Sequence, residues 1–213
     1  MSAEAFVVAG TDTGIGKTVF SAALTLALDA VYWKPVQSGL PGDTETVKSL
    51  TGLPDERFLP EAYRLKTPCS PHRAAEIDGH SIDPLKLALP RIERRLVVEL
   101  AGGLLVPYSK ALLQIEVAAG WKAPVVLCAR TALGTINHTL LSLEALRARR
   151  VPVLGVAFIG EPDEAAERAV VDHSGARRLG RLPRLKRLDP VSLRRGFEEG
   201  FRREDFTVLA ASL

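Results

Sequence analysis

Short apolar runs alternate with longer segments of helical spacing along the chain. Runs of strand length cover residues 6–10, 31–36, 96–100, 125–129 and 151–159, and residues 180–185 form a last short candidate. Helical spacing is found at residues 19–28, 44–51, 84–95, 135–149, 163–179 and 190–203. This alternation predicts a doubly wound, mostly parallel α/β sheet flanked by helices. We expect a single domain over residues 1–213.

Some of these segments carry more detailed expectations. Residues 135–149 form the clearest amphipathic pattern. The core side of this helix is predicted to carry four residues: Ile136, Leu140, Leu143 and Leu146. Pro90 must kink or break the segment over residues 84–95. Residues 64–83 contain two prolines and a glycine, which predicts a long loop of the kind that is often functional.

A glycine-rich turn follows the first predicted strand. Residues 10–18 read Gly-Thr-Asp-Thr-Gly-Ile-Gly-Lys-Thr and lead into the helix over residues 19–28. A strand, loop and helix in this order present backbone N–H groups and a helix N-terminus to a phosphate. We expect Lys17 to reach the terminal phosphates and Thr18 to ligate Mg²⁺. From Gly10, five residues instead of the usual four precede Gly16. A chance Gly-Lys-Thr in a turn is the alternative, but the flanking strand and helix favour a nucleotide site.

Further polar residues stand near the ends of other predicted strands. Lys34 and Ser38 follow the second strand, Asp43 lies just beyond it, and Glu99 lies near the end of the third. The carboxyl ends of parallel strands face the ligand crevice. With Thr18, the two carboxylates supply the oxygen ligands that Mg²⁺ prefers, and Lys34 would neutralise charge near the γ-phosphate. The alternatives are an edge-strand carboxylate for Glu99, a helix cap for Asp43 and a surface position for Lys34.

Composition narrows the function classes. The chain has 213 residues, 46% hydrophobic and 25% charged, with a net charge of +3. Its arginines are spread widely, so we expect a solvated surface and no nucleic-acid partner. Cys69 and Cys128 do not make a disulfide or metal framework. No apolar run reaches the length of a membrane span and no signal pattern begins the chain, so we expect a cytoplasmic protein without membrane contact.

Four blocks in order along the chain resemble dethiobiotin synthetases, a family of P-loop NTPases. They are residues 10–18, Lys-Pro-Val-Gln-Ser-Gly at 34–39, Glu-Leu-Ala-Gly-Gly at 99–103 and Leu-Gly-Thr-Ile-Asn-His-Thr-Leu at 133–140; Pro-Cys-Ser-Pro-His at 68–72 also matches. The resemblance implies that ATP, CO₂ and 7,8-diaminononanoate give dethiobiotin, ADP and phosphate in biotin biosynthesis. The implied intermediates are a carbamate and a carbamic–phosphoric anhydride.

The resemblance also implies residue roles. The implied catalytic residues are Lys34, Lys17 and Thr13. The implied substrate contacts are Ser38, Thr13, Gly134, Thr135 and Asn137, the last three at a helix start that reaches across a homodimer interface in the family. The implied nucleotide contacts are Gly14, Ile15, Gly16, Lys17, Thr18, Val19, Asp43, Glu99, Leu100, Ala101, Gly102, Ile159, Gly160, Pro183, Arg184 and Leu185. The implied Mg²⁺ ligands are Thr18, Asp43 and Glu99.

The sequence departs from the family at two positions. Ile159 stands where the family commonly has an asparagine that reads adenine, which predicts weaker base selectivity, with the remaining contacts near Gly160 and residues 183–185. Leu100 stands where the family usually has glycine, which narrows the loop beside Glu99.

Two other classes of protein were compared with this reading. Partitioning and septum-site ATPase switches share the sheet but typically carry a second lysine at the start of the loop, where this chain has Ala-Gly-Thr at residues 9–11. ATP-dependent amidation or metal-cofactor synthases usually carry a glutaminase domain, for which this chain is too short. The synthetase reading is therefore preferred.

Overall fold

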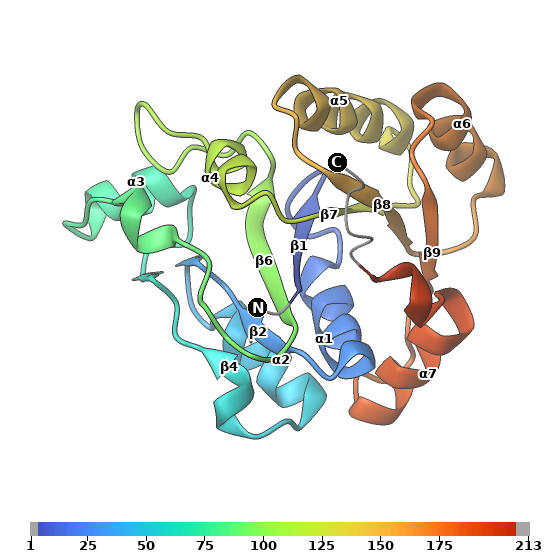
Figure 1. Ribbon diagram of the computed structural model, residues 1–213, viewed down its shortest axis with the longest axis horizontal. Helices are drawn as coiled ribbons and strands as arrows, with labels where there is room; N and C mark the ends of the chain where they lie inside the picture. Colours follow the sequence, from blue (N-terminus) through green and yellow to red (C-terminus); the bar gives the residue numbers. More distant parts are fainter. Residues whose placement is uncertain (1–3, 208–213) are drawn as a thin grey trace.

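Seven strands form one parallel sheet in the computed structural model, which describes residues 4–207 (Figure 1). The sheet order is β4-β2-β6-β1-β7-β8-β9. These strands are β1 (Ala5–Gly10), β2 (Val31–Trp33), β4 (Phe58–Leu59), β6 (Leu96–Gly103), β7 (Val125–Arg130), β8 (Val153–Ile159) and β9 (Arg178–Leu182). A separate parallel pair joins β3 (Val36–Ser38) to β5 (Tyr63–Leu65). The parallel α/β fold class is confirmed, while the outermost residues of the predicted domain, 1–3 and 208–213, lie outside the described part.

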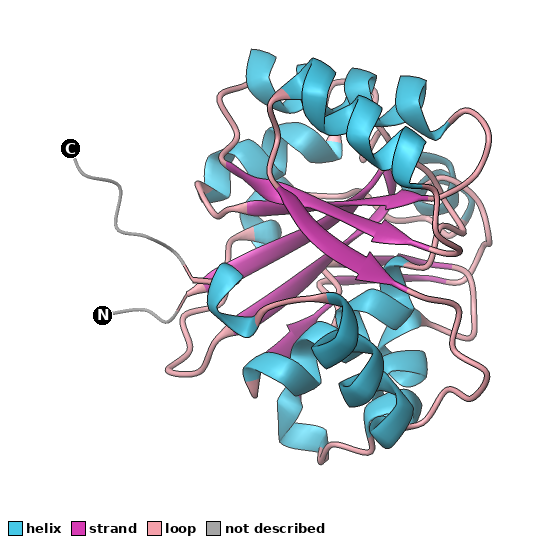
Figure 2. Ribbon diagram, turned by 90° about the vertical axis from the view of Figure 1, so that its right-hand side faces the viewer, coloured by secondary structure: helices cyan, strands magenta, loops and turns pink. Residues whose placement is uncertain are grey.

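Helices cover both faces of the sheet (Figure 2). One face packs against α1 (Lys17–Leu28), α2 (Asp43–Thr51) and α7 (Pro190–Gly200). The other packs against α4 (Gln114–Trp121), α5 (Thr135–Ala148) and α6 (Glu164–Ser174). The short helix α3 (Pro71–Ile77) lies beside β3 and β5. Short 3₁₀ turns cover Asp55–Arg57, Pro84–Leu87 and Arg203–Asp205. Within residues 4–207, no helix combines the length and apolar character needed to cross a membrane.

The central strand β1 is fully buried from Phe6 to Gly10 because it serves both cores. Phe6 and Val8 pack into the α1 side, and Val7 and Ala9 into the α5 side, as the period of two in a strand requires. β1 pairs with β6 on one side and β7 on the other. The chain continues from β1 to β2 in one direction and reaches β7 and β8 in the other. The strand order therefore reverses at β1, which ends at Gly10. Open α/β sheets bind their ligands at such a point.

Two predictions about local structure are wrong. Residues 84–95 were expected to be helical, but only a 3₁₀ turn at Pro84–Leu87 forms, and Ala88 is already extended. Proline at position 90 has no N–H to donate, so a helix through this position would lose a backbone hydrogen bond. Residues 64–83 were expected to be a loop but contain most of β5 and all of α3. Pro71 occupies the first turn of α3, where the missing N–H costs nothing.

The core-facing side of α5 is also shifted from the prediction. Leu143 and Leu146 are buried as expected, but Ile136 is 37% exposed and Leu140 is half-buried. Thr135 and Thr139 are buried in their place. The Thr139 hydroxyl donates to the Thr135 carbonyl at 2.7 Å, so its polar group is satisfied inside the helix. The first turn of α5 therefore presents an apolar residue outward.

An aromatic cluster fixes the C-terminal segment to α1. Phe206 is fully buried, with ring centroids 5.4 Å from Phe197 and 6.5 Å from Phe20. We expect Phe206→Ala to lower the free energy of unfolding by about 3–5 kcal/mol, because it leaves a cavity in the core. The control Val191→Ala, at a side chain 76% exposed on α7, should change it by less than about 0.5 kcal/mol. Urea denaturation followed by circular dichroism measures both, and equal losses would contradict the packing role.

Candidate active site

The loop between β1 and α1 is shaped to receive an anion. Gly16 is the N-cap of α1 and has a φ of 96°, which favours glycine. A Cβ at Gly16 would also lie 2.8 Å from Ile159 Cγ2, so no side chain fits there. The cap makes no side-chain hydrogen bond, so the N–H groups of the first turn are left for a ligand. The predicted phosphate loop thus has suitable backbone geometry.

Lys17 lies beside this loop and is 6% exposed. Its Nζ donates to the Asp12 carbonyl at 2.7 Å, which folds the side chain back over the loop. Burial lowers the pKa of Lys17, against the opposing charge of Glu99.

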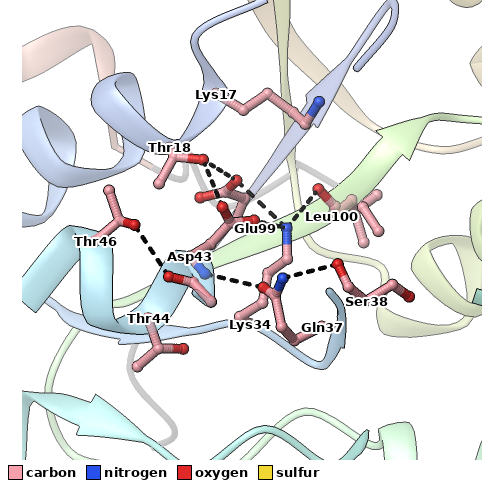
Figure 3. A network of polar contacts seen from close by, with 12 residues as sticks. Lys17, Thr18, Lys34, Gln37, Ser38, Asp43, Thr44, Thr46, Glu99 and Leu100 are labelled. Carbon is pink, nitrogen blue, oxygen red and sulfur yellow. Dashed lines mark hydrogen bonds and ion pairs between the residues drawn. The ribbon is translucent and has the colours of Figure 1, made fainter. Parts of the chain in front are cut away.

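A second lysine stands between two carboxylates from different segments (Figure 3). Lys34 Nζ lies 2.6 Å from Asp43 Oδ2 and 3.4 Å from Glu99 Oε1, and it donates to the Leu100 carbonyl at 3.3 Å. Lys34 follows β2, Asp43 begins α2 and Glu99 lies within β6. The structure therefore brings together three residues that are up to 65 positions apart in the sequence.

Burial makes these charges depend on one another. Lys34 is 3% and Glu99 1% exposed. Burial alone lowers the pKa of the Lys34 ammonium, but the carboxylates of Glu99 and Asp43 outweigh it, and the pKa is raised. For Asp43, burial raises the pKa, and the charge and hydrogen bonding of Lys34 and Thr18 outweigh it and lower the pKa. The lysine and Asp43 therefore remain charged at neutral pH.

Tyr32 is a site residue that sequence analysis did not identify. Its hydroxyl donates to Glu99 Oε2 at 2.9 Å, and its side chain is fully buried. Burial, with the charge of Glu99, raises the pKa of Tyr32 well above its usual value, so the hydroxyl stays a donor. In the sequence Tyr32 is one more large residue in an apolar strand, and no motif marks it.

The oxygen atoms near Thr18 fit a magnesium ion. Thr18 Oγ1 lies 2.9 Å from Glu99 Oε1 and 3.2 Å from Asp43 Oδ1. One hydroxyl proton satisfies only one of these oxygens, whereas a cation among them satisfies all three. Neighbouring ligands of an octahedral Mg²⁺ are also about 3 Å apart. Among residues 4–207 no group of three or more His, Cys, Asp or Glu could hold a metal. The oxygen donors at this point are instead two carboxylates and one hydroxyl. That set suits Mg²⁺, which usually retains water and phosphate ligands.

A cavity of about 620 Å³ opens beside Lys34. Its lining includes Thr13, Lys34, Ser38, Asp43, Cys69 and Gly102. Within the described part of the chain, Ser38 Oγ is buried and has no hydrogen-bond partner. A buried hydroxyl without a partner is available to a polar ligand. Thr13 and Ser38 thus line the same cavity.

The other predicted residues fall into two groups. Near the phosphate loop, Ile159 packs beside Gly16. The next residue, Gly160, donates its N–H to the Leu182 carbonyl at the end of the neighbouring strand β9. Residues 183–185 follow directly after that strand. The helix start at residues 134–137 is not part of the lining of the cavity beside Lys34. Gly134 and Asn137 are exposed, and Thr135 is buried inside α5. Leu100 is buried, and its carbonyl accepts from Lys34.

Comparison with known proteins identifies relatives over nearly the whole chain. Residues 4–192 match a family model described as an AAA domain. The chain is 62% identical over 202 residues to an ATP-dependent dethiobiotin synthetase BioD of Rhodopseudomonas palustris strain HaA2, covering 94% of this chain and 95% of that protein. It is 61% identical over 208 residues to the protein of the same name from strain CGA009, covering 97% and 98%.

Solved structures with the same fold are more distant in sequence. The cell-division ATPase MinD of Pyrococcus furiosus superposes with a TM-score of 0.53 at 18% identity, covering 97% of this chain and 92% of that one. The MinC:MinD complex of Aquifex aeolicus gives a TM-score of 0.52 at 15% identity, covering 91% and 86%. These likenesses show the fold alone.

The hydrogen bond from Tyr32 gives a direct test of whether these oxygen atoms bind magnesium. We expect Tyr32→Phe to weaken Mg²⁺ binding in the presence of ADP roughly tenfold, because the Glu99 carboxylate loses the donor that orients it. Calorimetric titration with Mg²⁺ measures the affinity. Tyr63→Phe is the matched control, since its hydroxyl instead accepts from the Asp83 N–H. Unchanged affinity in Tyr32→Phe would exclude an orienting role.

Proposed function

Because the chain belongs to the family of ATP-dependent dethiobiotin synthetases, we propose that its buried lysine and carboxylates carry out that family's reaction in the geometry described above. The protein is an ATP-dependent ligase that forms dethiobiotin in biotin biosynthesis. The observation that carries the residue-level proposal is the position of Lys34. It lies between Asp43 and Glu99, beside both the phosphate loop and a cavity.

The proposed reaction joins two anions. One amine of 7,8-diaminononanoate captures CO₂ as a carbamate and releases a proton. A carbamate oxygen then attacks the γ-phosphorus of ATP, and the bond to ADP breaks. The second amine attacks the carbamoyl carbon of the resulting anhydride, releases a proton and expels phosphate, which closes the ureido ring. Since carbamate and triphosphate repel each other, the site must supply positive charge and hold the partners in line.

We assign the roles by position. Lys17 neutralises the terminal phosphates, with the backbone of residues 14–19 around them. Lys34 lies on the cavity side and neutralises the carbamate and the γ-phosphate as they meet. Thr18, Asp43 and Glu99 would hold Mg²⁺, which supplies further charge neutralisation on the phosphate oxygens. Thr13 and Ser38 contact the diamine in the cavity, where the Ser38 hydroxyl is free to bond.

We also propose that two copies complete each site. Apolar side chains are exposed along α5 and just before it: Leu133 is 102%, Ile136 37% and Leu141 56% exposed. Beside Leu141, a cavity of about 580 Å³ reaches Thr13. A second copy covering this face would bring a helix N-terminus, with Gly134, Thr135 and Asn137, to the partner's cavity. Free N–H groups at a helix start favour an anion such as the substrate carboxylate.

The setting of the enzyme follows from these substrates. We propose that it works in the cytoplasm on small molecules, without nucleic-acid or membrane partners, in keeping with its mild net charge of +3. The alternative, a partitioning-type ATPase switch, is supported by the fold likeness alone. Residues 9–11 lack the second lysine that such switches typically carry.

Removal of Lys34 tests the proposed chemistry. With diaminononanoate, bicarbonate and MgATP, the unaltered enzyme should release dethiobiotin and phosphate. We expect Lys34→Ala to lower kcat roughly 100- to 1000-fold, because charge developing in the transition state loses its partner, while ADP still binds. Lys48→Ala, at a half-exposed lysine on α2 paired with Asp55, is the control and should keep full turnover. Normal turnover by Lys34→Ala would refute the assignment.

Base selectivity tests the proposed contribution of Ile159. An aliphatic side chain cannot read the edge of adenine, so we expect ATP to be preferred over CTP and GTP by less than about a hundredfold. Competition assays that compare kcat/KM for the three nucleotides measure this preference. Ile159→Asn should increase it, and Ile159→Val, which keeps the contact apolar, should not. A strong ATP preference in the unaltered enzyme would count against the proposal.

A further inference from the structure

The chain has only two glutamines, Gln37 and Gln114, and both are buried near the cavity beside Lys34. Gln37 is 6% exposed and Gln114 is 1% exposed. A buried amide must have partners for both its oxygen and its nitrogen, so the side chain can join backbone segments that do not pair in a sheet. The hydrogen bonds of the two residues follow one pattern.

Gln37 fastens the loop between β3 and α2 (Figure 3). Its Nε2 donates to the Ser38 carbonyl at 3.1 Å and to the Gly39 carbonyl at 3.0 Å. Its Oε1 accepts from the Asp43 N–H at 3.0 Å. One side chain therefore fixes the backbone of Ser38, whose free hydroxyl lies at the cavity, and the first residue of α2, whose carboxylate binds Lys34.

Gln114 fastens a second segment that borders the cavity, residues 101–103 at the end of β6. Its Nε2 donates to the Ala101 carbonyl at 2.5 Å and also to the Gly103 carbonyl. Its Oε1 accepts from the Ala101 N–H at 3.2 Å and from the Tyr108 hydroxyl at 3.2 Å. The segment it holds lies close to Thr13, because a Cβ at Gly102 would be 3.0 Å from Thr13 Oγ1.

We propose that Gln37 and Gln114 are positioning residues, each of which fixes the backbone of one segment that lines the diamine cavity. In each, the amide nitrogen joins two carbonyls of a segment that borders the cavity, and the oxygen accepts from a backbone N–H. Ser38 and Gly39 line one wall, and Ala101 and Gly102 line the other. Gln114 is not part of the lining and acts only through the backbone it holds, whereas Gln37 also lines the cavity itself.

The consequence is specific to the diamine. Two amines must reach one carbamoyl carbon in turn, so the reaction depends on how accurately the residues that line the cavity are placed. A displacement of about 1 Å at a positioning residue can cost about 100-fold in rate. Gln37 and Gln114 make no hydrogen bond to residues 14–19, so the part of ADP binding that depends on the phosphate loop does not require these two amides. This inference rests on the proposed function, since it names the diamine as the occupant of the cavity.

The test replaces each amide by methionine, a side chain of similar length that has no N–H donor and only a weak acceptor. We expect Gln37→Met and Gln114→Met each to raise the KM for the diamine or lower kcat/KM for it roughly 10- to 100-fold. Their affinity for ADP in EDTA, measured by calorimetry, should stay within about twofold of the unaltered enzyme. Gln37→Glu and Gln114→Glu keep the acceptor and lose the donors, so they should show the same loss if donation to the wall carbonyls matters.

A matched control separates positioning from stability. Ser174→Ala removes a buried hydroxyl that bonds to the Val170 carbonyl and the Ala176 N–H at the end of α6. It should lower the melting temperature without changing the KM for the diamine. Folded glutamine variants with unaltered diamine kinetics would overturn the inference, as would equal kinetic losses in Ser174→Ala. Dethiobiotin formation by the unaltered enzyme is measured first, so failure of the proposed function is recognised separately.

Discussion

The site depends on one buried ionic interaction, the ammonium of Lys34 held between the carboxylates of Asp43 and Glu99. Removing these charges from water is costly, and each is tolerated only because the others are present. The Tyr32 hydroxyl donates to the other oxygen of Glu99, and the Thr18 hydroxyl lies within hydrogen-bond distance of the other oxygen of Asp43. The carboxylates of this site already stand close together around a positive charge. Such a site is preorganised to accept a magnesium ion and a polyphosphate, as phosphoryl transfer requires.

The parallel sheet is what makes this interaction possible. Lys34 follows β2, Glu99 lies in β6 and Thr18 lies in the first turn of α1, the helix after β1. The three strands are neighbours in the order β2-β6-β1. Because all three run in the same direction, their carboxyl ends open at one edge. Asp43 reaches the same place through the loop that Gln37 fastens. β1, at the centre of this group of strands, is buried on both faces.

Sequence alone predicted the fold class and the grouping of Thr18, Lys34 and Glu99, because strand periodicity and the glycine-rich turn are local signals. The role of Asp43 rested on the family resemblance. The sequence did not predict Tyr32, Gln37 or Gln114, whose importance arises from contacts between segments far apart in the chain. The orientation of α5 was missed because Thr135 and Thr139 satisfy their hydroxyls within the helix and so take core positions. Helix α3 was missed because proline in a first turn resembles proline in a loop.

A crystal structure of the enzyme with ADP, Mg²⁺, aluminium fluoride and the diamine tests the central claim most directly. The account predicts the metal about 2.1 Å from Thr18 Oγ1 and from a carboxylate oxygen of Asp43 and of Glu99. It also predicts that Lys34 Nζ lies between the fluoride group and the diamine. A metal bound by other residues, or a diamine outside the cavity that Thr13 and Ser38 line, would contradict it.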